Sequence, residues 1–161
     1  FHNAAAETMR ISGDGYVTKP LQPAFLSNGA NVSNVTGDGT VYVMLFGGVQ
    51  VFDQNSDFDE TTGLFTAPVT GRYNFFTSFN PEGLTSSHTL AYEQIVTSNS
   101  YSSVFQANPY TLGNGSSFSL SGTYFADMDA SDTCKVNFAV QNGAKVVDVT
   151  TAARFGGWLV C

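Results

Sequence analysis

The chain has 161 residues and a mass of 17.2 kDa, which suits one domain because globular domains cluster at about 100–150 residues. Hydrophobic residues make up 42% of the sequence and aromatic residues 14%, which is too apolar for a disordered chain. Six lysines and arginines stand against 13 acidic residues and give a net charge of −7, so we expect no nucleic-acid partner and no membrane-surface partner.

Residues 1–20 are predicted to form an extended arm ahead of the main domain. Ala4–Ile11 could start a helix, but eight residues are too few for a stable isolated helix, so we interpret them as a connector. Neither a secretory leader nor a run of about 18 apolar residues is present, so no membrane insertion is expected. Because the chain opens with Phe1, we expect a processed product or a piece of a longer protein.

From residue 21 onward, apolar residues recur with a period of two, which is typical of half-buried strands. In Thr133–Val140, for example, Cys134 and Val136 alternate with polar residues. Glycine-rich turn signals separate the runs, and many short strands at this spacing predict an all-β sandwich or barrel. The ten expected strands are Leu21–Leu26, Val41–Phe46, Val49–Asp53, Leu64–Ala67, Tyr73–Phe79, Thr89–Val96, Phe118–Phe125, Thr133–Val140, Lys145–Val149 and Phe155–Val160.

The segment Asn99–Ser117 is rich in Ser, Asn and Gly and is predicted to be a long loop. Its aromatic residues need an explanation, because a loop rarely keeps apolar area exposed without a partner. Aromatic rings stack on sugar faces and short polar side chains bind hydroxyl groups, so this loop is a candidate saccharide site. Alternatively, the rings anchor the loop to the sandwich. The candidate ligand-binding residues are Tyr101, Phe105, Asn108, Tyr110 and Asn114.

The segment Thr62–Phe75, TGLFTAPVTGRYNF, resembles the signature of the complement C1q and tumour necrosis factor-like jelly rolls. Pro23–Phe25, Ala130–Thr133 and Phe155–Val160 are similar to the first strand of that family, to a turn containing Asp, and to its closing strand. The resemblance covers about residues 21–161, which we take as the head domain. It implies a ten-strand jelly-roll β-sandwich that assembles as a compact homotrimer.

Within Gly71–Phe79, alternate residues divide between two faces. Tyr73, Phe75 and Phe79 share the face that would fill the sandwich. The other face carries Asn74, Phe76 and Ser78, which the resemblance implies as the trimer interface. An alternative is that a loop of the same chain covers Phe76.

The arm carries a second resemblance. Glu7–Pro20 is similar to the segment that precedes C-terminal heads in bacteriophage fibres and other virion-surface proteins, although Ile11 and Val17 around Gly13–Gly15 could equally form a plain β-hairpin. It implies a phage fibre head on the extracellular virion surface, which attaches to a host glycan or protein and contacts other virion proteins through the arm. Alternatives are a capsid decoration or fibre cap, or a secreted C1q-like lectin glycosylated at Asn31, Asn34 or Asn114.

No enzyme activity is expected. The histidines are His2 and His88, and the sequence has no G-x-S-x-G turn that would present a nucleophile. Glycoside hydrolysis needs only two carboxylates and is not excluded by spacing alone. Cys134 and Cys161 are expected to be free thiols.

Two acidic segments are candidates for binding a metal ion. The run Asp53–Glu60 fails the EF-hand pattern, because Phe58 stands where the loop needs glycine, so a solvated hairpin loop is the plainer interpretation. Asp127, Asp129 and Asp132 precede a strand, and the family resemblance makes calcium a candidate ligand there. Alternatively, these aspartates hydrogen-bond their own turn. No other cofactor is expected.

Overall fold

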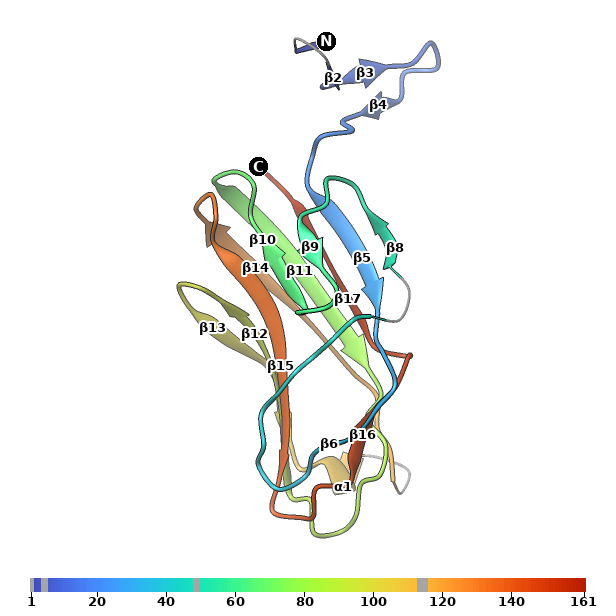
Figure 1. Cartoon of the computed structure of the whole chain (residues 1–161), viewed down its shortest axis with the longest axis vertical. Coiled ribbons are helices and arrows are strands. Elements are labelled where there is room, and N and C mark those ends of the chain that lie inside the picture. The colour runs from blue at the N-terminus through green and yellow to red at the C-terminus, as the bar shows by residue number, and fades with distance from the viewer. Residues whose placement is uncertain (1, 4–5, 48–49, 113–115) are drawn as a thin grey trace.

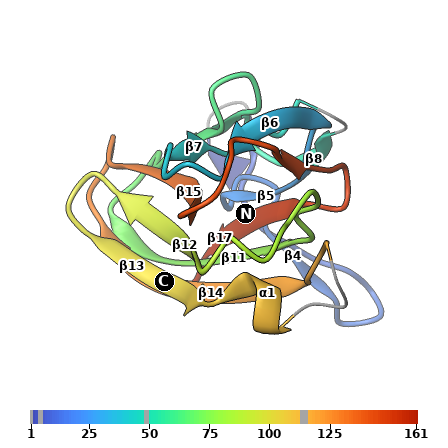
Figure 2. The same ribbon diagram turned by 90° about the horizontal axis from the view of Figure 1, so that it is seen from below.

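The computed structural model describes residues 2–3, 6–47, 50–112 and 116–161, and within them two antiparallel sheets pack face to face (Figure 1). The five-stranded sheet consists of β5 (Ala24–Asn28), β8 (Gln50–Asp53), β11 (Gly71–Phe79), β14 (Leu120–Met128) and β17 (Arg154–Leu159), in the order β14-β11-β17-β5-β8. The six-stranded sheet consists of β7 (Tyr42–Val43), β9 (Phe58–Asp59), β10 (Leu64–Thr66), β12 (Leu90–Thr97), β13 (Tyr101–Ala107) and β15 (Thr133–Gln141). Its order is β13-β12-β15-β10-β9, and β7 also pairs with β15. The edge strands β13 and β14 lie side by side (Figure 2).

Smaller elements lie at the two ends of the sandwich. At one end the arm carries β1 (His2–Asn3) with β2 (Ala6–Glu7) and β3 (Arg10–Ile11) with β4 (Val17–Thr18), and it projects beyond the sheets (Figure 1). Ile11 pairs with Val17, so the hairpin interpretation of this segment is confirmed. At the other end lie β6 (Val32–Thr36), β16 (Val147–Val149) and the short helix α1 (Pro109–Leu112). No helix within the described ranges has the length and apolar character needed to cross a membrane.

The expected all-β sandwich is confirmed, and each of the ten predicted strands overlaps an observed one. The prediction of a loop over Asn99–Ser117 is wrong for Tyr101–Ala107, which form β13 and pair with β12, and for Pro109–Leu112, which form α1. The segment reads as a loop because its serines have low strand propensity, but the partner strand supplies the backbone hydrogen bonds that the residues need. Strands β6 and β9 were also not predicted.

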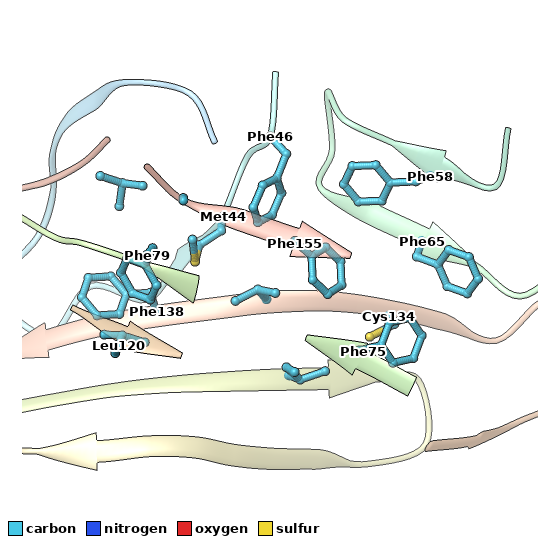
Figure 3. Packing of buried hydrophobic residues seen from close by; sticks show 14 of the residues in the cluster. Met44, Phe46, Phe58, Phe65, Phe75, Phe79, Leu120, Cys134, Phe138 and Phe155 are labelled. Carbon is cyan, nitrogen blue, oxygen red and sulfur yellow. The ribbon is translucent and has the colours of Figure 1, made fainter. Parts of the chain in front are cut away.

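Aromatic rings fill the space between the sheets (Figure 3). Phe25 stacks on Phe58 with ring centroids 4.6 Å apart and meets Phe155 edge-on at 5.1 Å. Further along the sandwich, Phe79 packs edge-on against Phe138 at 4.5 Å. Such ring pairs contribute about 0.5–1.5 kcal/mol each beyond the area they bury. The core is therefore well suited to hold both outer faces in fixed positions.

Candidate binding surfaces

Along β11, side chains alternate between the core and the outer face of the five-stranded sheet. Tyr73, Phe75, Thr77 and Phe79 are buried, whereas Asn74, Phe76 and Ser78 are only partly buried and point away from the core. The expected division of Gly71–Phe79 between two faces is therefore confirmed.

Strand register extends this outward face across the whole sheet. Asn74 lies between Phe125 of β14 and Trp158 of β17, while Phe76 lies between Thr123 and Gly156. From Gly156 the same row continues through Leu26 of β5 to Phe52 of β8. We call this set the outer apolar face; its apolar members are Leu26, Phe52, Phe76, Phe125 and Trp158.

The large side chains of the outer apolar face are accessible to solvent in the single chain. Phe52 is 48% exposed, Phe125 55% and Trp158 44%. The rings of Phe76 and Trp158 lie 6.3 Å apart, and the Phe76 ring covers Gly156, where a Cβ would come within 2.5 Å of it. Phe76 is thus packed by its own sheet neighbours and still partly exposed. Phe52, Phe125 and Trp158 were not among the predicted site residues, although each lies in a predicted strand.

A cleft of about 440 Å³ adjoins the outer apolar face at the arm end. It is lined by Val17 and Lys19 from the arm and by Trp158 from β17, among others. The linker is held beside the head by Gln54, whose Nε2 donates to the Lys19 carbonyl at 2.7 Å. The arm therefore reaches the rim of the outer apolar face.

The residues predicted to form one saccharide-binding loop are divided by the structure. Tyr101 is 68% exposed at the start of β13, whereas Phe105 is half-buried and stacks on Phe118 at 5.5 Å. Tyr110 is 46% exposed on α1, at the opposite end of the sandwich from the arm (Figure 1). Asn108 accepts a hydrogen bond from the Tyr110 backbone N–H at 3.1 Å, and Asn114 lies outside the described residues. Tyr101 and Tyr110 thus point to solvent at separate places, and Phe105 anchors its strand.

Both carboxylate oxygens of Asp132 accept hydrogen bonds from neighbouring loop residues. Its Oδ1 accepts from Ser98 Oγ at 2.7 Å, and its Oδ2 accepts from Asn99 Nδ2 at 2.6 Å and from the Asp129 backbone N–H at 2.8 Å. These hydrogen bonds lower the pKa of Asp132, and the one from Ser98 has the largest effect. Asp127 lies instead 3.9 Å from Arg72 Nε. No group of three or more metal-ligating side chains gathers within the part of the chain that is described. The hydrogen bonds of Asp132 fit the alternative in which these aspartates bind their own turn.

His88 holds two loops together in the buried end of the sandwich. Its Nδ1 accepts the Thr85 backbone N–H at 2.9 Å, which leaves the proton on Nε2 to donate to the Ala144 carbonyl at 3.0 Å. Gly143 packs so closely that a Cβ there would lie 2.3 Å from the ring. Both ring nitrogens therefore serve structural hydrogen bonds.

Two further titratable side chains are buried between the sheets. Glu93 is fully buried; Thr77 Oγ1 donates to its Oε1 at 2.7 Å, and its Oε2 has no hydrogen-bond partner. Burial raises the pKa of Glu93 to about 8. Burial likewise raises the pKa of the Cys134 thiol, while Cys161 is exposed; both cysteines are free thiols.

No known family model matches the sequence, and no curated protein matches it. Solved structures share the fold at low sequence identity. The globular domain of a zebrafish complement 1qA protein superposes with a TM-score of 0.59 at 21% identity, covering 87% of this chain and 98% of that domain. Murine APRIL at pH 8.0 superposes with a TM-score of 0.59 at 10% identity, covering 86% of this chain and 99% of APRIL. These similarities confirm a C1q and TNF-like jelly-roll fold.

Proposed function

We propose that the chain is the homotrimeric binding head of a bacteriophage fibre or surface appendage, which attaches the virion to a glycan or protein of the host cell. The similarity to C1q and TNF-family heads supports a trimeric binding module, and the resemblance of residues 7–20 to fibre segments motivates the phage context. The arm would join the head to other virion proteins.

The observation that carries the trimer is the outer apolar face. Exposed aromatic side chains on three different strands, Phe52, Phe125 and Trp158, lie on the outer face of one sheet, which also carries the partly buried Phe76. Contiguous apolar patches of this kind on a folded chain mark interaction sites. In a threefold head, two further copies of the chain would cover the outer apolar face.

A trimer would also strengthen weak recognition. Three identical shallow sites on one rigid head bind a repetitive cell surface with an avidity about 10²–10⁴ times the single-site affinity, provided that they engage together.

Sedimentation of the full chain tests this proposal. We expect about three times the chain mass for the native protein and a smaller mass for Phe76→Lys, because a charge buried in an apolar interface without a partner is costly. Ser86→Lys, which adds the same charge in an exposed loop, is the matched control and should keep the native mass. A native protein that sediments as a monomer at micromolar concentration contradicts the trimer. If the Phe76→Lys variant keeps the native mass, Phe76 does not lie in the interface.

A further inference from the structure

The solvent face of β13, β12 and β15 carries a distinct mixture of side chains. Register places Tyr101 beside Val96 and Val96 beside Lys135. In the next two rows, Ser103 lies beside Gln94, and Gln106 lies beside Tyr92. We call this surface the tyrosine face; its members are Tyr92, Gln94, Val96, Tyr101, Ser103, Gln106 and Lys135.

We propose that the tyrosine face binds an acidic oligosaccharide. This inference rests on the binding role proposed above, whereas it does not require the chain to be a trimer. It places recognition on the sheet opposite to the outer apolar face, so a ligand and a neighbouring copy do not compete for the same surface.

The dimensions of the tyrosine face suit an extended ligand of several sugar rings. Tyr101 and Lys135 lie on strands separated by β12, so their backbones are about 10 Å apart at the usual strand spacing. Tyr92 lies four residues from Val96 along β12, which is about 13 Å at the usual rise per residue. The two tyrosines therefore sit at opposite ends of this surface.

The side chains of this surface match the chemistry of sugars. Tyr101 is 68% exposed and offers a rigid ring with little conformational freedom to lose on binding. Gln94 Nε2 donates to Ser103 Oγ at 3.3 Å, which orients the amide and uses only one of its two N–H groups. Amides and hydroxyls both donate and accept, as sugar hydroxyls do. A protein partner would instead favour an aromatic or aliphatic centre depleted of such groups.

Charge favours an acidic sugar over a neutral one. The chain carries a net charge of −7, yet the outward positions of β12, β13 and β15 carry Lys135 and no carboxylate. Glu93 of β12 points into the core, and Asp132, which precedes β15, has its oxygens hydrogen-bonded to Ser98 and Asn99. Asp59 of β9 lies in the same row as Lys135, beyond Leu64 of β10 and on the side away from Tyr101. A carboxylate on the ligand can therefore approach Lys135 from the side of β12 and β13, whose outward positions carry no acidic side chain.

The test compares two probes on the full chain, measured per site by calorimetry or by NMR titration. One is a short hyaluronan oligosaccharide, which contains glucuronate, and the other is a neutral chito-oligosaccharide with the same N-acetyl groups. We expect the native protein to bind hyaluronan more tightly. Tyr101→Ala should lower the affinity for both probes about tenfold, because ring stacking is lost. Lys135→Gln should lower the affinity for hyaluronan alone, by about threefold to fivefold, which is the usual contribution of an exposed ion pair.

Matched controls use the same substitutions elsewhere. Tyr16→Ala, at an exposed position of the arm, and Lys145→Gln, in an exposed loop, should leave both affinities unchanged. Absence of binding to either probe at millimolar concentration overturns the proposal, as does an equal effect of Tyr101→Ala and Tyr16→Ala. Sedimentation of the same samples separates the two proposals: a trimer that binds no sugar contradicts only this one, and a monomer that binds sugar contradicts only the trimer.

Discussion

Replacing Glu93 by glutamine should remove a strong pH dependence from the stability of the fold. Glu93 is fully buried between the sheets, with Thr77 Oγ1 at 2.7 Å from Oε1 and no hydrogen-bond partner for Oε2. Burial raises the pKa of its carboxyl from 4.5 to about 8, because the charged form loses its hydration. Glutamine has nearly the same shape and carries no charge at any pH.

The sign of the effect follows from proton linkage. The folded chain keeps the Glu93 proton up to about pH 8, whereas the unfolded chain releases it near pH 4.5. The contribution of Glu93 to the free energy of unfolding is therefore fully present below pH 4.5 and is lost as the pH rises to about 8. At 1.36 kcal/mol per unit of pKa, the loss is at most about 5 kcal/mol.

Denaturant unfolding from about pH 5 to about pH 9 at one protein concentration measures this loss. The native chain should lose several kcal/mol of stability relative to Glu93→Gln across that range, whatever the difference between the two proteins at pH 5. Glu82→Gln, at an exposed position, should retain the native pH profile. Parallel profiles for the native chain and Glu93→Gln would show that the buried carboxyl does not cause the pH dependence.

Two other perturbations test the packing of the sheets and the acidic turn. Gly122→Ala should destabilise the fold by about 1–3 kcal/mol in thermal melts, because the new Cβ would lie 2.5 Å from Val104 Cβ where β13 meets β14. The control Gly13→Ala has open space around the new Cβ and should melt like the native chain. Because both oxygens of Asp132 already accept hydrogen bonds, we expect the same melting temperature in chelator and in millimolar calcium. A higher melting temperature in calcium would instead establish a cation site, since a ligand of the folded state stabilises it.

The alternation of apolar residues was enough to predict the sandwich. Tyr73–Phe79 and Thr133–Val140 became the central strands β11 and β15, because a strand packed on one side must bury every second residue. The same rule assigned Tyr73, Phe75 and Phe79 to the core and Phe76 to the opposite face. Applied to Thr89–Val96, it also places Glu93 with the buried residues Ala91 and Ile95, so the burial of this carboxyl could have been predicted from the sequence.

Register and strand pairing were decided by the tertiary structure alone. Nothing in the local pattern shows that Phe125 and Trp158 flank Asn74, or that Lys135 lies two strands away from Tyr101. Residues 101–107 form β13 because their backbone groups pair with those of β12, although the serines of this segment favour a loop. Periodicity is a property of neighbouring residues and can be read from the sequence. A binding face is made by residues far apart in the chain, and their alignment depends on how the whole sandwich closes.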